Sequence, residues 1–231
     1  MASKKISRKQ LLKEPDEFIT FTGKLIQFYT QHQSQIIGGL AAFIILLASI
    51  AGYRYYTLRA EAQASFQLTR IKTTYEELSA DGDAASAYAG IKADMEALMK
   101  TYGNRSSGKV AGIIMGDYSY QAGEYAAARE YYEKALGSFP AGSIYASRLL
   151  SSLAYTCLAE GDATKASSYF EKTVADTDAL MKDEALFNLA ILSSAADASP
   201  TTPSFWQQIV SDHEKSMYRE IALEKSGEPD A

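Results

Sequence analysis

The residues best placed to do chemistry in this sequence form a near match to a phosphate-binding loop. Gly103-Asn-Arg-Ser-Ser-Gly108-Lys109 has the glycine spacing and the lysine of the pattern Gly-x-x-x-x-Gly-Lys-Ser/Thr. The next residue is Val110, which offers no hydroxyl to Mg²⁺, and the preceding segment has the periodicity of a helix where a strand is needed. We therefore predict a glycine-rich corner between two helix pairs over residues 103–108.

The other reactive side chains are few and scattered. Neither of the two histidines, His32 and His213, stands at a useful spacing from a nucleophile or a second metal ligand. The single cysteine, Cys157, excludes an internal disulfide and is expected to be a small core residue. Asp81 and Asp83 lack the further ligands of a calcium loop and indicate a turn. We predict that the protein is not an enzyme and binds no metal or cofactor.

Charge is distributed unevenly along the chain. Residues 1–24 contain six Lys or Arg against three acidic residues, a net charge of +3, whereas the remainder contains 17 against 25, a net charge of −8. An acidic domain repels phosphate backbones, so we expect no nucleic acid among its partners.

An uncharged apolar run occupies residues 36–53. Its 18 residues reach about 27 Å as a helix, close to the roughly 30 Å hydrocarbon core of a bilayer. We predict a basic tail with an amphipathic helix over 1–35, a transmembrane helix over 36–53, and a folded domain over 54–231. A cleaved signal peptide is the alternative, because Ala60, Ala62 and Ala64 are small. The long tail and the intervening Arg54 and Arg59 favour an uncleaved anchor.

The orientation of this span is argued from the positive charges around it. Close to the span, Lys24 alone precedes it, whereas Arg54, Arg59, Arg70 and Lys72 follow it. The tail is nevertheless short enough to be counted as a whole, and charges on a long translocated domain matter less. We therefore give more weight to the basic residues of the whole tail than to the count close to the span, and we predict a cytoplasmic N-terminus and a domain on the far side. The basic residues of the tail are Lys4, Lys5, Arg8, Lys9, Lys13 and Lys24.

An apolar stripe precedes the span, at three- and four-residue steps, and comprises Phe18, Phe21, Leu25 and Phe28. This segment is expected either to lie along the membrane surface, to dock onto a partner, or simply to lead into the span.

Within the span, small residues share one helical face, although Ile45 interrupts the row. Small side chains let the backbone of another helix approach closely in lipid. We therefore predict a packing face for a second copy or for another membrane protein at Gly38, Ala42, Ser49 and Gly52.

Helical periodicity dominates the rest of the chain, which predicts an all-α domain without strands. A segment of 18 residues beginning Gly123-Glu-Tyr-Ala-Ala-Ala128 and ending Ser-Phe-Pro140 resembles the second half of a tetratricopeptide repeat, with Met115-Gly116 in the first helix. A second copy follows 38 residues later, with Leu153-Ala154, Gly161, Ala166 and Phe170, and a third begins at Leu186 before departing into a loop over 199–204.

This spacing has a physical reason. Small residues at Gly116, Ala128, Ala154 and Ala166 let paired helices cross closely. Larger neighbours fill the gaps between pairs, namely Met115, Tyr132, Leu153 and Phe170. One pair cannot bury its own apolar face, so about three must stack, with atypical ends. We predict a tetratricopeptide-like α-solenoid that follows a single transmembrane helix.

The order of basic tail, single span, repeat helices and terminal helix Tyr218–Gly227 also resembles a family. It is similar to the bacterial inner-membrane proteins known as ancillary subunits of the Sec translocon. That resemblance implies a periplasmic repeat domain that associates with chaperones and newly exported chains.

The first helices of each pair line the inward-curving side of such a solenoid. We expect this groove to expose Ile113, Asp117, Tyr120, Arg148, Tyr155, Phe187 and Asn188. Aromatic and apolar groups with few charges suit an extended peptide or a partner helix. In the alternative, the terminal helix covers several of these residues.

These features predict a membrane-anchored scaffold, and the resemblance implies that its membrane is the bacterial inner membrane. Its expected partners are the lipid bilayer and other proteins, for which the resemblance implies export machinery, chaperones or exported chains. The alternative function is a homo-oligomeric structural or assembly protein of the cell envelope.

Overall fold

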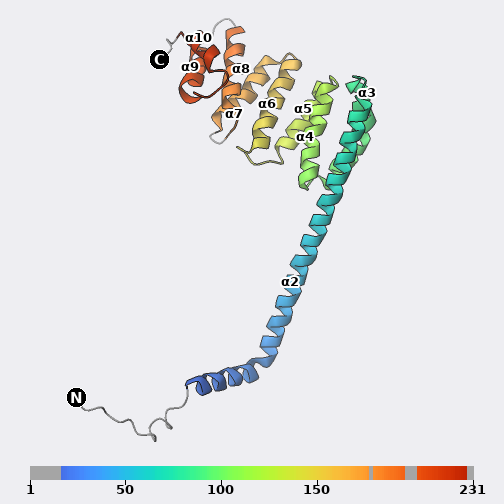
Figure 1. Cartoon of the computed structure of the whole chain (residues 1–231), viewed down its shortest axis with the longest axis vertical. Helices are drawn as coiled ribbons and strands as arrows, with labels where there is room; N and C mark the ends of the chain where they lie inside the picture. The colour runs from blue at the N-terminus through green and yellow to red at the C-terminus, as the bar shows by residue number, and fades with distance from the viewer. Residues whose placement is uncertain (1–16, 177–178, 196–201, 228–231) are drawn as a thin grey trace, which may run out of the picture. The chain divides into compact units, whose positions relative to one another are not determined.

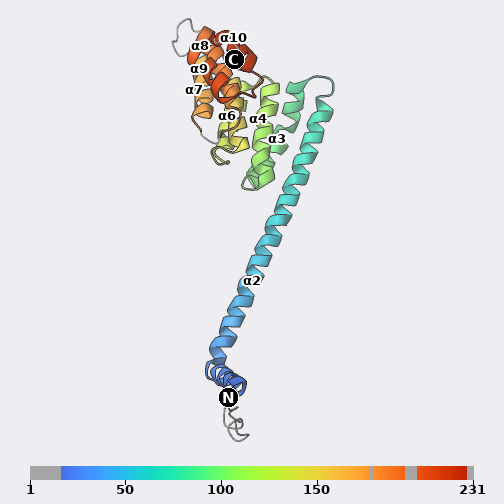
Figure 2. The same cartoon turned by 60° about the vertical axis from the view of Figure 1, so that its left-hand side comes forward.

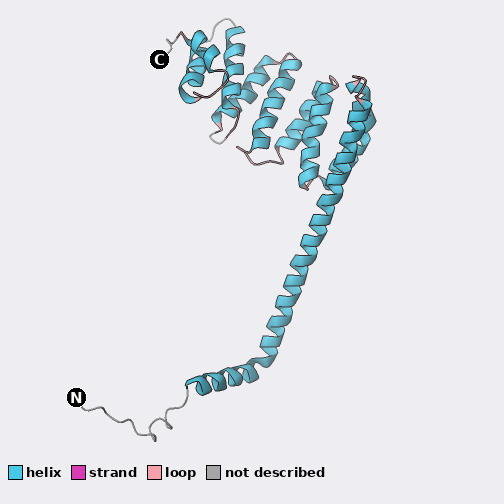
Figure 3. Cartoon of the chain, in the orientation of Figure 1, coloured by secondary structure: helices cyan, strands magenta, loops and turns pink. Residues whose placement is uncertain are grey.

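The structure, a computed structural model, describes residues 17–176, 179–195 and 202–227 (Figure 1, Figure 2). Every regular element in these ranges is an α-helix (Figure 3), which confirms the predicted fold class. The basic residues 1–16 and part of the loop predicted over 199–204 lie outside the described residues. The chain divides into two compact units, Met1–Leu58 and Arg59–Ala231, which are described separately. The predicted boundaries at 35 and 53 stay predictions.

The first unit contains most of helix α2, which runs over Glu17–Leu78. This helix bends at His32, where φ is −116° and ψ is 18°. Nδ1 of His32 lies 2.9 Å from Oε1 of Gln35. Before the bend, the side chains of Phe21, Leu25 and Phe28 are exposed, whereas the side chain of Phe18 lies outside the description. After the bend comes the apolar run. Among the described residues, α2 is the one helix that is long and apolar enough to cross a membrane.

In the second unit, the C-terminal part of α2 pairs with α3 (Ala84–Tyr102). Ile71 and Tyr75 from α2 and Ile91 and Met95 from α3 share one buried cluster. The ring of Tyr75 also stacks on Tyr118 at 3.5 Å between centroids. The first pair is therefore joined to the next by aromatic packing, as a terminal pair of a solenoid must be.

The following helices form the repeats. They are α4 (Ser106–Gln121), α5 (Tyr125–Leu136), α6 (Ile144–Ala159), α7 (Ala163–Ala175), α8 (Lys182–Ala195), α9 (Thr202–Asp212) and α10 (Arg219–Ser226). Successive helices pack on one another in chain order (Figure 1). The fourth pair, α8 and α9, is followed by α10, which packs on α9 as the end of the stack.

The helices cross closely at the small residues predicted from the sequence. Ala128, Ala154 and Ala166 are 0% exposed. Gly116 is also buried, against the ring of Tyr132. The larger residues Met115, Leu153 and Phe170 are buried as predicted, so the alternation of small and large residues does define the core of the solenoid.

A left-handed glycine lies in the turn after the first helix of three successive pairs. Gly82, Gly123 and Gly161 have φ of 84°, 79° and 80°, a left-handed conformation that other residues rarely adopt. Asp83 and Asp162 follow two of them, and each carboxylate accepts a backbone N–H three residues later. Asp83 is therefore a helix cap, and the turn predicted at residues 81–83 is present.

The corner predicted over residues 103–108 is shorter in the structure. Helix α4 already begins at Ser106, so the second half of the near match to a phosphate-binding loop is helical. Gly108 packs so tightly that a Cβ atom would overlap the carbonyl oxygen of Tyr102. The need for glycine here is explained by this close approach between successive helices.

The N-terminus of α4 is capped by a residue from α2. The Glu61 carboxylate accepts hydrogen bonds from the backbone N–H groups of Ser106 and Ser107, at 2.9 and 2.8 Å, and from Oγ of Ser107 at 2.7 Å. Arg105, at the N-cap position, provides no such bond. Burial raises the pKa of the Glu61 carboxyl, but the bonds from Ser107 and Ser106 and the charge of Arg105 outweigh burial and leave that pKa lowered.

Replacing Glu61 with alanine is expected to lower the free energy of unfolding by about 1–2 kcal/mol, as the loss of a helix cap does. Glu61→Gln keeps an acceptor oxygen and should lose less. Because the folded-state pKa of Glu61 is lowered, its contribution is present at neutral pH and is lost as the pH falls through that pKa. Urea unfolding at pH 7 tests the ranking, and equal stability of Glu61→Ala and the natural protein would contradict it.

Candidate functional site

The first helices of the pairs carry a polar network centred on Asp117 of α4. One carboxylate oxygen of Asp117 accepts a hydrogen bond from the hydroxyl of Tyr132 on α5 at 2.8 Å. The other pairs with Nη2 of Arg148 on α6 at 2.6 Å. The structure therefore brings together two residues of the predicted groove, and Asp117 connects three helices. The Arg148 side chain is still 54% exposed, so it is able to meet a ligand.

A second network is centred on Glu184 in the first turn of α8. Its carboxylate accepts hydrogen bonds from the hydroxyl of Tyr155 at 2.7 Å and from Oγ of Ser151 at 3.1 Å. Nδ2 of Asn188 donates to the Tyr155 hydroxyl at 3.1 Å. Tyr155 and Asn188, both predicted for the groove, thus lie together on α6 and α8. Glu184 was missed, although its position four residues before Asn188 places it on the same helical face.

Of the predicted groove residues, one is buried and one is partly covered. Ile113 is 3% exposed and belongs to the core cluster of Leu149 and Leu153, so its predicted exposure is wrong. It turns toward the neighbouring pair because α4 is packed on both sides. Phe187 stacks on Tyr218 at 4.4 Å and meets Trp206 edge-on at 5.6 Å. At Phe187, therefore, the C-terminal segment covers part of the surface, which the alternative prediction expected for several of these residues.

The exposed part of the groove is consequently rich in tyrosine. Tyr120 and Tyr155 are 36% and 37% exposed. The Tyr120 ring lies 5.3 Å from that of Tyr125, which supports it from α5. Such rings offer broad apolar contact with a polar tip, and they lose little conformational freedom on binding. Together with Arg148, these tyrosines form what we call the groove, from α4 to α6.

Several tyrosines have raised pKa values. Burial is the main cause, and it raises the pKa of Tyr118, Tyr155 and Tyr169 to about 12 from an ordinary value of 10.0. Nearby carboxylates add to this effect, since Glu184 faces Tyr155 and Glu133 accepts a bond from Tyr169. Burial and Asp117 also raise the pKa of Tyr132.

These shifts predict a sharp loss of structure at alkaline pH. A folded protein with raised tyrosine pKa values holds those protons more tightly than the unfolded chain does. The stability that these tyrosines contribute should therefore be fully present below pH 10 and fall as the pH rises from 10 toward 12. Helical circular dichroism and tyrosinate absorbance, measured together, should change in one step. Full ionisation of the tyrosines with the helices intact would contradict this prediction.

The other reactive residues lie apart. Cys157 is 0% exposed, and burial raises the pKa of its thiol. His213 lies between α9 and α10 beside Asp183 and Asp212 in a shallow hollow. Across the described residues, no group of three or more His, Cys, Asp or Glu is placed to hold a metal ion. That the protein lacks enzymatic activity stays a prediction.

The small residues of the apolar run are exposed within the first unit. A Cβ atom at Gly38 or Gly52 would have no neighbour within 4 Å. Ser49 donates its hydroxyl to the carbonyl of Ile45 at 2.8 Å, within its own helix. Ala42 is exposed as well. Packing of this face against another helix stays a prediction.

Stacked helix pairs with a tyrosine-lined face define an α-solenoid of the class that mediates protein-protein interaction. The chain belongs to the tetratricopeptide repeat-like domain family, whose model matches residues 26–183. The match takes in the apolar run as well as the pairs up to α7, and it ends as α8 begins. No curated protein matches the chain.

Proposed function

We propose that this protein is a membrane-anchored scaffold that holds a tetratricopeptide-like binding surface beside a bilayer. One observation carries the proposal, namely that an uncharged 18-residue apolar run is joined to an α-solenoid in one chain. In the most apolar stretch of α2, no residue is buried. An apolar surface of this length is stable only when lipid or protein covers it. Tethering makes weak binding effective, because it raises the local concentration of the partners.

The same proposal extends to the compartment and the process. The charge of the N-terminal tail favours a cytoplasmic N-terminus and a periplasmic domain in a bacterial inner membrane. The resemblance to ancillary subunits of the Sec translocon favours a role in protein export or in chaperone handling of exported chains. We further propose that the scaffold is not an enzyme.

Photocrosslinking tests the binding surface. A photoreactive phenylalanine analogue at Tyr120 or Arg148 should capture export machinery, chaperones or exported chains in intact membranes. The same analogue at Glu171, an exposed residue of α7 outside the groove, is the matched control. Identical products from groove and control positions, or none above background, would refute the binding role. A C-terminal topology reporter tests the compartment separately, and cytoplasmic activity of that reporter would refute the orientation.

The segment before the bend at His32 fits the membrane surface. On a helical wheel with 100° per residue, the apolar residues of 18–29 fall on one half and nearly all polar residues on the other. We therefore propose that residues 17–31 lie in the membrane–water interface, while the apolar run spans the bilayer. With Cys157 changed to serine, single cysteines at Leu25 and Gln27 should report opposite environments. A fluorophore at Leu25 should show blue-shifted emission in vesicles, and equal spectra at both sites would contradict the placement.

A homo-oligomeric structural protein is the second candidate. It is favoured by the uncovered small-residue face from Gly38 to Gly52, which would let two spans approach closely. Mass measurement of the full chain in mild detergent distinguishes the two. A strict monomer would rule out this second function and leave the scaffold proposal intact.

A further inference from the structure

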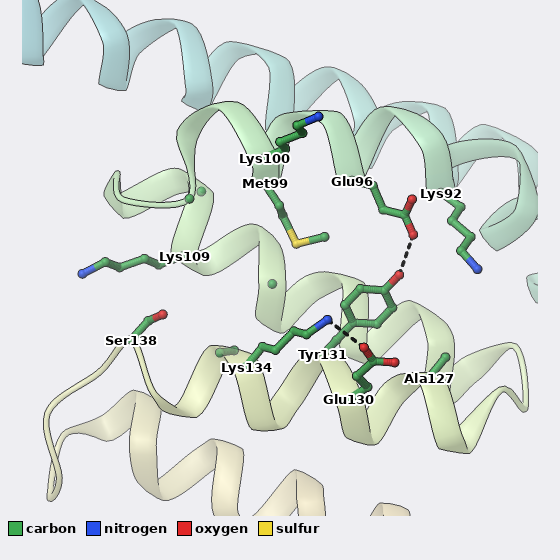
Figure 4. Close-up of a pocket in the computed structure, with 14 residues that line it drawn as sticks. Lys92, Glu96, Met99, Lys100, Lys109, Ala127, Glu130, Tyr131, Lys134 and Ser138 are labelled. Carbon is green, nitrogen blue, oxygen red and sulfur yellow. Dashed lines mark hydrogen bonds and ion pairs between the residues drawn. The ribbon is translucent and has the colours of Figure 1, made fainter.

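A pocket of about 560 Å³ lies outside the groove, between the second helices α3 and α5 (Figure 4). One wall is a single face of α3 and the other a single face of α5, and the N-terminal part of α4 closes the floor. Met99 extends into the space between the two walls (Figure 4). The groove is formed by first helices, whereas this pocket belongs mainly to second helices, so the two are separate surfaces.

The pocket exists because α4 carries no side chain at two floor positions. Gly108 and Gly112 line it. Thirty-eight residues later, in the next repeat, the corresponding residues are Ala146 and Leu150. The Leu150 side chain is 9% exposed and fills its position. A cavity at this point is therefore a property of this pair and not of every repeat.

The charges around the pocket are mainly positive. Four lysines and two glutamates line it, a net charge of +2 in a chain whose net charge is −5. Both glutamates already have partners, because Glu96 accepts a hydrogen bond from Tyr131 at 2.8 Å and Glu130 pairs with Lys134 at 2.7 Å (Figure 4). The remaining lysines are Lys92, Lys100 and Lys109. In the described part of the chain, no carboxylate lies within 4.0 Å of their ammonium groups.

The interior of the pocket is apolar and elongated. Met99, Ala127, Ala135 and the ring of Tyr131 contribute to its lining. From Lys92 to Gly103 the α3 wall extends for about 16 Å at 1.5 Å per residue. An extended peptide covers this distance with about five residues at roughly 3.3 Å each. Positive groups along the rim and an apolar interior suit carboxylates with an apolar side chain among them.

We propose that this pocket binds an extended acidic peptide segment of a partner protein. The carboxylates of the segment meet Lys92, Lys100 and Lys109, while an apolar side chain packs on Met99. This inference rests on the proposed scaffold function and gives the scaffold a second binding surface. The scaffold could therefore hold one partner in the groove and another in the pocket.

Fluorescence anisotropy tests the proposal with the full chain in mild detergent. The probe is a fluorescein-labelled peptide, Glu-Asp-Leu-Glu-Asp-Leu. We expect saturable binding that the double variant Lys100→Glu with Lys109→Glu weakens at least 10-fold, and that Gly112→Leu weakens by filling the pocket. Lys172→Glu on α7 is the matched control and should retain the natural affinity. A probe in which every acid is replaced by its amide should not bind.

The outcomes separate this inference from the proposed function. The proposal that the pocket binds an acidic peptide would be overturned by an absence of saturable binding. Equal affinities of the natural protein and the double lysine variant would overturn it as well. Circular dichroism melting should show that both variants are folded. Crosslinking from Tyr120 in the double lysine variant should persist, because the groove is a separate surface. Loss of these crosslinks in a folded variant would show that pocket and groove are one site, and would overturn the proposal of two.

Discussion

Replacing Gly116 with alanine is expected to lower the free energy of unfolding by about 2 kcal/mol, although alanine favours a helix by about 1 kcal/mol over glycine. A Cβ atom at this position would overlap Cε1 of Tyr132 and lie 2.9 Å from its Cζ. The ring cannot move aside easily, because Tyr132 is 3% exposed and its hydroxyl is bonded to Asp117. The substitution should therefore force α4 and α5 apart.

Gly112→Ala is the matched control on the same helix. There the nearest side-chain atoms to a Cβ would be Ala135 Cβ at 3.6 Å and Met99 Sδ at 3.9 Å, which are ordinary contacts. This variant should be as stable as the natural protein, or more stable by up to about 1 kcal/mol. Thermal unfolding of the full chain in detergent, followed by circular dichroism, measures both. Equal melting temperatures for the two variants would show that the close crossing at Gly116 is unimportant.

Placing lysine at both Ile45 and Leu46 is expected to release the protein from membranes. Each lysine near the middle of a span costs about 3 kcal/mol and also removes the roughly 0.5 kcal/mol that the apolar residue contributed. The nine Ile, Leu and Phe residues of the run favour insertion by only about 4 kcal/mol in total. The double change costs about 7 kcal/mol on the same scale, so insertion should become unfavourable.

Extraction of membranes with alkaline carbonate is the measurement. The natural protein should remain in the pellet, and the double lysine variant should appear in the soluble fraction. Lysines at Leu58 and Phe66, which are 65% and 70% exposed and follow the run, form the control and should leave the protein in the pellet. Release of the natural protein by carbonate would refute the membrane anchor altogether.

Much of the fold was predictable because it depends on local patterns. The small residue at Ala154 and the large one at Phe170 occupy the same places as Gly116 and Tyr132 one repeat earlier. The period of the repeat therefore identified the positions at which paired helices cross closely. It also located the first helix of each pair, since Gly123 and Gly161 end those helices.

The binding surface was less predictable, because exposure depends on what packs against a helix from elsewhere in the chain. Ile113 was assigned to the correct helix, but it faces Leu149 and Leu153 of the next repeat and is therefore part of the core between the repeats. Phe187 is partly covered by Trp206 and Tyr218, which belong to the part of the chain beyond the last clear repeat. The lysine pocket was missed for a related reason, because its lysines are scattered over 43 positions of sequence from Lys92 to Lys134.

The cap that Glu61 provides has a practical consequence for anyone who shortens this chain. A soluble fragment that begins at Arg59 keeps the carboxylate that holds Ser106 and Ser107, together with the buried Ala64. A fragment that begins a few residues later, at Ser65, lacks both and leaves the first backbone amides of α4 without that acceptor. Starting points on either side of Glu61 should thus differ in yield and in resistance to proteolysis, even though both lack the entire apolar run.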